Sequence, residues 1–170
     1  LCSPENPIGR VWTAPELQRM AQICRQNGVV LVSDEIHCDI VRRGVQHLPI
    51  LKAVPDCSNL VMVSGVNKSF NLMGLQCAYS IIPDDKLRAA YSAEYYPEPP
   101  TPFAIAAVIA SYNESEDWLG ALNDYIDRAF VEVTGYFRKK LPKVKVYIPE
   151  GTYTLWVDFS DYGYSQDILQ

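Results

Sequence analysis

Four residues of this sequence have types that could act together chemically, and Lys68 is the most informative of them. It lies in a polar loop of the segment SGVNKSFNLMGLQCAYSII, between apolar runs at 60–63 and 77–82. Lysine is among the residues least often buried. Burial lowers its pKa, and the resulting neutral amine can form a Schiff base with an aldehyde. The alternative is an ordinary surface lysine, the usual position for an isolated one.

The other three residues are Asp34, His37 and Asn6. Asp34 and His37 directly follow the apolar run 29–32, and open α/β sheets bind ligands at the carboxyl ends of their strands. Asn6 lies in a loop punctuated by proline and glycine. Each also has an ordinary structural interpretation. Asp34 could be a strand-end cap, His37 a hydrogen-bonded histidine and Asn6 a turn residue before Pro7.

The elements that must position these side chains alternate between helix and strand. Thr13 and Glu16 have the spacing of a capping box that starts a helix, and Gly28 is suited to end it. The β-branched run 29–32 predicts a strand buried on both faces. The apolar runs on either side of Lys68 predict two more strands. This alternation predicts an α/β fold with a mostly parallel sheet covered by helices.

The second half of the chain predicts further elements around the proline-rich residues 96–102, which cannot be regular structure. We expect helices over 86–95 and, apolar on every side and so fully buried, over 103–109, and strands over 143–148 and 152–159.

A long helix should separate these groups of elements. It starts near Asn113 or Ser115, with a capping box from Asn113 to Glu116, and ends before Pro142. At 1.5 Å per residue it spans about 35–40 Å, enough to leave one domain and enter another. We therefore predict three parts: residues 1–112 in a large domain, 113–141 as an interdomain helix and 142–170 as the beginning of a small α+β domain.

Composition excludes several classes of function. The chain has 170 residues, a net charge of −5 and a pI of about 5.0, so nothing attracts nucleic acid or an anionic membrane. No apolar run approaches the roughly 20 residues of a membrane span. The five cysteines form no CxxC pair, which indicates reduced thiols in a cytoplasmic protein and no metal site. We assign no role to His47.

Three short segments occur in an order that carries a family resemblance. SPENPIGRVWT, SDEIHCDIV and KSFNLMGLQ resemble the cystathionine β-lyase/C–S lyase branch of the class I/II aminotransferases, which are fold-type I pyridoxal 5′-phosphate (PLP) enzymes. The resemblance extends from Leu1 to about Phe159 and includes GTYTLWVDF. It implies that Lys68 holds PLP and serves as the base, and that Asp34 faces the pyridine nitrogen. It also implies that Asn6 and His37 lie near the phenolic oxygen.

The resemblance leaves the phosphate site less well defined. Relatives often have Ser or Thr one and three residues before the lysine, where this chain has Asn67 and Gly65, with Ser64 one residue out of step. Gln76 stands where many aminotransferases have arginine, as is usual in the C–S lyase branch. We therefore expect Ser64 and Gln76 as neutral cofactor-binding residues, with no cation.

Three functions are consistent with these residues. The first is a PLP-dependent C–S β-lyase acting on cystathionine or cysteine-type amino acids, and the second is a PLP-dependent aminotransferase. Both would work as homodimers on small-molecule substrates, with no nucleic-acid or membrane partner. The third is a catalytically incomplete fragment that only self-associates. Family members are much longer, so we expect a piece of a longer protein that does not turn over substrate alone.

Overall fold

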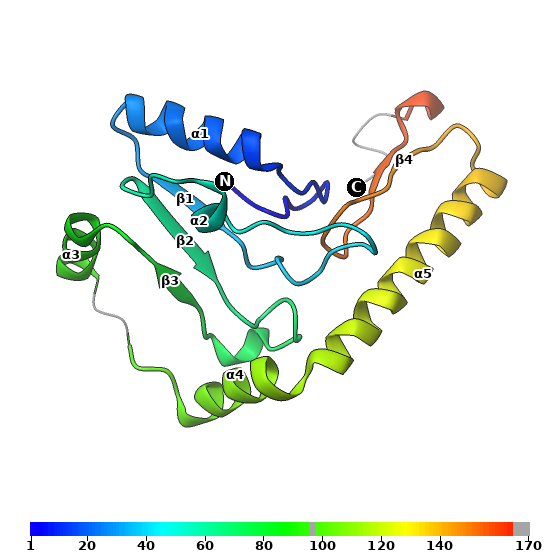
Figure 1. The fold of residues 1–170 in the computed structure, drawn as a ribbon. Helices are drawn as coiled ribbons and strands as arrows, with labels where there is room; N and C mark the ends of the chain where they lie inside the picture. The colour runs from blue at the N-terminus through cyan, green and yellow to red at the C-terminus, as the bar shows by residue number, and fades with distance from the viewer. Residues whose placement is uncertain (96–97, 165–170) are drawn as a thin grey trace.

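The computed structural model, which describes residues 1–95 and 98–164, contains two small sheets joined by a long helix (Figure 1). The helices are α1 (Ala14–Gln26), α2 (Ile50–Ala53), α3 (Asp85–Glu94), α4 (Pro102–Glu114) and α5 (Glu116–Lys140), with short 3₁₀ turns at Met73–Leu75 and Ser160–Tyr162. The strands are β1 (Leu31–Asp34), β2 (Leu60–Ser64), β3 (Tyr79–Ile81), β4 (Lys145–Tyr147) and β5 (Trp156–Asp158). None of the described helices combines the length and apolar character that crossing a membrane requires.

The first sheet has the order β1-β2-β3. β1 and β2 are parallel and pair Asp34 with Val63, whereas β3 is antiparallel to β2. Leu1 to Ser3 lie along the other edge of β1, where the Asp34 N–H donates to Leu1 O (2.8 Å) and the Ser3 N–H donates to Asp34 O (2.9 Å). The carboxyl ends of β1 and β2 therefore meet at one edge, followed by the polar segments predicted to do chemistry.

Helix α1 forms as its capping residues predict. The Thr13 N–H donates to the Glu16 carboxylate (2.9 Å), which lowers the pKa of Glu16. Gly28 follows the helix at φ +66°, a left-handed conformation that glycine adopts without strain. One face of α1 packs into a core of fully or nearly fully buried residues: Leu17, Ala21, Ile50, Ala53, Val54, Leu60 and Met62.

Two strands are less buried than the sequence predicts. β1 begins two residues later than expected, and its Val32 is 46% exposed, so the strand is not buried on both faces. β3 covers only three residues, all exposed. β3 is the edge strand of the sheet and runs antiparallel to β2, and such a strand tolerates contact with water. Lys68 therefore follows one buried strand, β2, and precedes an exposed one.

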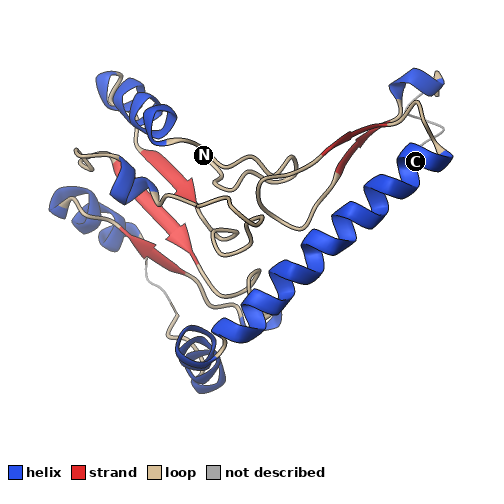
Figure 2. Cartoon of the chain, turned by 45° about the vertical axis from the view of Figure 1, so that its right-hand side comes forward, coloured by secondary structure: helices blue, strands red, loops and turns tan. Residues whose placement is uncertain are grey.

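In the second half α3 and α5 form where the sequence predicts helices, whereas one predicted cap and one predicted burial are wrong. α5 is one unbroken helix of 25 residues, about 37 Å long at the usual rise, and runs from the first sheet to the β4–β5 pair (Figure 2). Its N-cap is Ser115, whereas Asn113 belongs to α4, so a cap at Asn113 is wrong. α4 is not fully buried: Phe103 is 80% exposed and Ile109 54%, because no described element covers that face.

Both strands expected here form, shorter than predicted, and β4 and β5 pair antiparallel. The turn between them returns to the loop after β1, where Gly151 forms a bridge with Val41. Residues 96–97 of the expected irregular segment and 165–170 at the end of the expected small domain lie outside the described residues. The division into a large domain, an interdomain helix and a small domain stays a prediction.

Candidate active site

The edge of the first sheet places Asp34 and His37 together. Asp34 ends β1, and its carboxylate accepts a hydrogen bond from the Ile36 N–H (3.0 Å), which turns the chain away from the strand. His37 follows, only 4% exposed. Burial lowers the pKa of His37, while the negative charge of Asp34 raises it and the positive charge of Lys68 lowers it further. Both charges therefore act on the same imidazole.

The His37 ring is held by packing more than by hydrogen bonds. Its Nδ1 is buried and has no hydrogen-bond partner within the part of the chain that the structure describes. The ring meets Tyr153 edge to face, with 5.7 Å between centroids and 67° between planes. An aromatic contact of this kind orients the ring and leaves its polar atoms available for another group.

Lys68 lies in the loop that follows β2. Gly65 lets this loop pass close to the segment before β3, because a Cβ at this position would lie 2.8 Å from Cys77 O. The Lys68 side chain is half-buried, and its Nζ lies 3.2 Å from the Met73 Sδ. A thioether is a weak acceptor, so the amine is not committed to a strong partner.

Asp39 fixes the lysine loop in place. The Ser69 hydroxyl, fully buried, donates to the Asp39 carboxylate (2.8 Å). The Asn123 side-chain amide of α5 donates to the Asp39 carbonyl (2.9 Å). On the other side of the loop, Phe70 stacks on Trp118 at 5.9 Å between centroids. Sequence reasoning missed Asp39, although its place in the same polar segment as His37 was an available signal.

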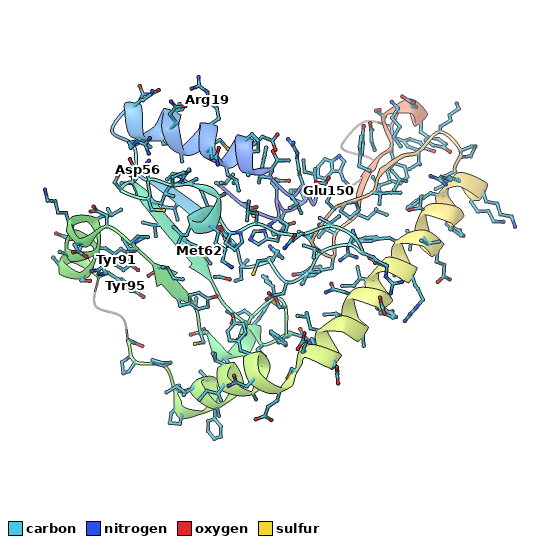
Figure 3. The ribbon with its side chains drawn as sticks, in the orientation of Figure 1. Arg19, Asp56, Met62, Tyr91, Tyr95 and Glu150 are labelled. Atoms are coloured by element: carbon cyan, nitrogen blue, oxygen red, sulfur yellow. The ribbon has the colours of Figure 1, made fainter. Side chains whose placement is uncertain are left out.

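A cavity of about 270 Å³ opens beside Lys68. Its walls come from the lysine loop, from α5 and from the turn before β5, and include Lys68, Met73, Trp118, Leu122, Tyr125 and Tyr153. A larger hollow of about 450 Å³ lies beside α1, but its lining, which includes Arg19 and Asp56 (Figure 3), contains none of the predicted site residues. Of the predicted site residues, Lys68 lines the smaller cavity, whereas Asn6, Asp34 and His37 are not part of its lining.

The remaining predicted residues occupy different positions. Asn6 is exposed and lies near the same sheet edge, because its backbone is hydrogen-bonded to Cys2, which forms a bridge with Asp34. Burial raises the pKa of the Cys2 thiol, and the hydrogen bond from the Asn6 backbone lowers it. Ser64 is buried, and its hydroxyl donates to Glu35 O (3.1 Å). Gln76 is exposed at φ 45° before β3. Neither Ser64 nor Gln76 lines the cavity beside Lys68.

The turn after β1 is supported by a buried pair of side chains, Glu35 and His47, that the sequence did not reveal. Glu35 is fully buried, and its carboxylate lies 2.9 Å from the His47 Nε2. It also accepts hydrogen bonds from the Ser33 hydroxyl (3.0 Å) and the Ile50 N–H (2.9 Å). His47, to which the sequence assigned no role, is thus a structural partner of the residue next to Asp34. Since twelve residues separate the pair, no local pattern could indicate it.

The turn between β4 and β5 clamps the N-terminal loop. Gly9 O accepts hydrogen bonds from the Glu150 and Gly151 N–H groups, both 2.8 Å. The Glu150 carboxylate in turn accepts from the Val11 N–H (2.8 Å), and Figure 3 shows Glu150 beside this loop. The clamp joins the loop that carries Asn6 to the turn that carries Tyr153, although the two are far apart in sequence.

Comparisons with known proteins show what the whole chain is similar to. The sequence profile of the family "Aminotransferase class I and II" matches residues 1–170. The chain is 37% identical over 174 residues to cystathionine β-lyase PatB of Bacillus subtilis (strain 168), covering 100% of the chain and 45% of that protein. The structure of the PLP-bound C-S lyase from Staphylococcus hominis matches with a TM-score of 0.89 and 40% identity, over 95% of the chain and 41% of that protein.

The chain is also similar to an aminotransferase, the second function predicted from the sequence. Aspartate aminotransferase of Geobacillus stearothermophilus is 33% identical over 117 residues, which is 68% of the chain and 30% of that protein. The chain thus spans less than half the length of each of these relatives. The structural match confirms the α/β fold predicted from the sequence.

Proposed function

Because this chain belongs to the class I and II aminotransferase family, we propose that the whole protein is a PLP-dependent C–S β-lyase acting on cystathionine or other cysteine-type amino acids. The observation that carries the proposal is that Asp34 ends β1, Lys68 follows the parallel strand β2, and Tyr153 both contacts the buried His37 and lines the Lys68 cavity. The similarity to PatB and to a C-S lyase supports the lyase over other reactions of the family.

The residues present fit the cofactor. Lys68 offers a half-buried amine with a thioether beside it, and Asp34 offers an exposed carboxylate at a strand end. His37 has a buried ring nitrogen without a partner in the described part of the chain. When bound, PLP supplies an aldehyde for a lysine amine and a ring that accepts electrons from the substrate α-carbon.

Each residue then has a distinct role. The Lys68 amine would hold the cofactor and, once released, would take the α-proton of the substrate, so that the electron pair left behind would expel the thiol from Cβ. The Asp34 carboxylate would favour a proton on the ring nitrogen, with a gain limited by its exposure to water. Asn6 and His37 would lie near the phenolic oxygen. Elimination from cystathionine with uptake of one water gives homocysteine, pyruvate and ammonia.

Ser64 and Gln76, the two residues predicted to bind the cofactor phosphate, differ in the hydrogen-bond donors that they have free. Ser64 has one hydroxyl proton and donates it to Glu35 O, so it has none left for a phosphate oxygen. The exposed side-chain amide of Gln76 retains its donors. We therefore propose Gln76 as the stronger candidate, with backbone amides supplying the remaining contacts.

The second candidate function is an aminotransferase, which the similarity to an aspartate aminotransferase favours. Lys68, Asp34 and Asn6 serve both reactions in the same way, so they do not separate them. Release of pyruvate and thiol by the whole protein without a keto-acid acceptor indicates the lyase. Amino transfer that requires an added keto acid and releases no thiol would instead establish the aminotransferase.

Lys68→Ala in the whole protein tests the central role. We expect the absorbance of lysine-bound cofactor and pyruvate release to disappear together. Lys52→Ala and Lys86→Ala are matched controls, because both lysines are exposed and neither lines the cavity. If the lysine-bound cofactor persists in Lys68→Ala and is lost in a control, another lysine holds it and the assignment is wrong.

We further propose a cytoplasmic homodimer as the working form of the whole protein. Light scattering of the purified protein tests the dimer, and fractionation of the source cells tests the location.

We also propose that residues 1–170 alone do not sustain turnover. Steady pyruvate release by this chain with added PLP, absent in Lys68→Ala, would overturn that proposal.

A further inference from the structure

Tyr153 reaches the candidate site from the turn between β4 and β5. Its ring lies edge to face with His37, at 5.7 Å between centroids. The same residue lines the cavity of about 270 Å³ into which Lys68 projects. Tyr153 is 44% exposed, so its contact with the imidazole leaves part of the side chain open. One side chain thus contacts both the histidine and the lysine cavity.

The two neighbours of Tyr153 are tied to the segments that carry the other site residues. The Thr152 N–H donates to Ile40 O (2.8 Å), three residues beyond His37. The Thr154 hydroxyl donates to Pro7 O (2.8 Å), next to Asn6. The Tyr153 backbone is therefore bonded on both sides to the loops that it brings together.

The backbone at Thr152 is held in an unusual conformation. Thr152 is fully buried and has φ +67°, a left-handed value that is uncommon for a β-branched residue. Such a conformation persists only where the surrounding contacts determine it, and it is found most often at functional sites. At this position its consequence is the direction in which the next side chain, Tyr153, leaves the turn.

The His37 ring needs an external support. Its Nδ1 is buried and unpartnered among the described residues, so no hydrogen bond at that nitrogen sets the plane of the ring. The charged groups that act on it are Asp34, at the end of β1, and Lys68, in the loop after β2. Neither charge restricts rotation of the ring, whereas the edge-to-face contact with Tyr153 does.

We propose that Tyr153 is a positioning residue of this site, whose ring holds the His37 imidazole beside Asp34 and Lys68 and closes the lysine cavity on that side. The ring carries this role and the hydroxyl does not. The structural part of the proposal concerns the protein without cofactor, while its effect on turnover rests on the proposed function. The turn between β4 and β5 thereby becomes part of the site.

The test compares three variants of the whole protein: Tyr153→Ala, Tyr153→Phe and, as a control, Tyr136→Ala, which removes a 60% exposed tyrosine from α5. The first measurement is NMR titration of His37 without cofactor, with its signal assigned by its loss in His37→Gln. Because burial is the largest cause of the lowered pKa of His37, Tyr153→Ala should raise that pKa toward its ordinary value. Tyr153→Phe and Tyr136→Ala should leave it unchanged.

The second measurement is steady-state β-elimination from cystathionine. Misplacement of a reacting group by about 1 Å costs on the order of a hundredfold, so we expect kcat to fall about 10- to 100-fold in Tyr153→Ala with little change in KM. Tyr153→Phe should restore kcat. If Tyr153→Ala does not fold by circular dichroism, Tyr153→Leu, which fills more of the space without a ring edge, takes its place in both measurements.

Each outcome decides between the proposals. An unchanged His37 titration in the folded ring-deleted variant overturns the positioning role, as does a loss of kcat in Tyr153→Phe as large as in Tyr153→Ala. A changed titration in a protein that shows no β-elimination even as wild type supports the positioning role and overturns the proposed function. The His37 titration therefore tests the positioning role separately from the turnover assay, which tests the proposed function.

Discussion

Replacing Gly9 with alanine should loosen the clamp between the N-terminal loop and the turn that carries Tyr153. Gly9 has φ +72°, and a methyl group built there would overlap Pro149 Cβ and Gly151 O. The substitution therefore imposes two separate penalties. One is the left-handed backbone, which alanine adopts poorly, and the other is the collision with the opposing turn.

A second glycine isolates the first penalty. Gly28 has φ +66°, and a Cβ there would have nothing within 4 Å. Alanine in a left-handed conformation costs about 1–2 kcal/mol, which is the whole effect expected for Gly28→Ala. Overpacking costs a further 1–3 kcal/mol or so, so the total for Gly9→Ala is about 2–5 kcal/mol. That is a substantial fraction of the roughly 5–15 kcal/mol by which native domains are stable.

The two variants should also differ in function. Gly9 O accepts both hydrogen bonds that join the turn to the loop, so a displaced loop moves Asn6 relative to Tyr153. A shift of about 1 Å is enough for a loss of on the order of a hundredfold in turnover. Gly28 ends α1 far from the clamp, so Gly28→Ala should retain near-wild-type turnover and PLP affinity.

Urea titration of the whole protein followed by circular dichroism measures the first effect, and pyruvate release with a PLP titration measures the second. We expect a clearly lower denaturation midpoint for Gly9→Ala than for Gly28→Ala, with weakened turnover only in the former. Equal denaturation midpoints for the two variants would mean that the turn between β4 and β5 moves aside without a loss of stability. Wild-type turnover in Gly9→Ala would mean that the clamp does not position the site.

Three further predictions concern the supporting contacts. Ser69→Ala should cost about 1–3 kcal/mol because it removes the buried donor to Asp39; an unchanged thermal midpoint relative to wild type would contradict this. Glu35→Ala should cost about 3–5 kcal/mol, since it leaves His47 buried without its partner, and a urea midpoint within error of wild type would argue against a structural pair. Because the folded-state pKa of His37 is lowered, the unfolded chain binds the proton more readily, and stability present above about pH 6.5 falls as the pH drops through the folded value. His37→Gln should flatten this part of a stability profile between pH 8 and 5, and a slope identical to wild type would show that another group is responsible.

The local features of the chain followed from the sequence because their causes lie within a few residues. The Thr13–Glu16 capping box and the glycine after α1 are determined by neighbours one turn away. The same holds for the unbroken length of α5. The family could be inferred for a related reason, since each short cofactor segment keeps its residue types in order even though this chain spans less than half of its relatives.

Burial was the property that sequence patterns predicted least well. An apolar run states that a segment can be buried, but exposure depends on what packs against it. Val32, Phe103 and the three residues of β3 are exposed although each lies in an apolar run. The apolar runs at 29–32 and 103–109 therefore predicted element type correctly and burial wrongly.

The residues of the candidate site also fall into two groups, those that the sequence indicated and those that only the structure revealed. Asp34, His37 and Lys68 were recognisable from their types and their places after strands, because parallel strands bring their carboxyl ends to one edge. Tyr153 and the Asp39–Ser69 contact were not, since residues distant in sequence meet there only after the chain has folded. Sequence alone thus determined which groups could do the chemistry. Only the tertiary structure decided which side chains hold them in place, because packing against a ring or a buried carboxylate is a property of neighbours in space.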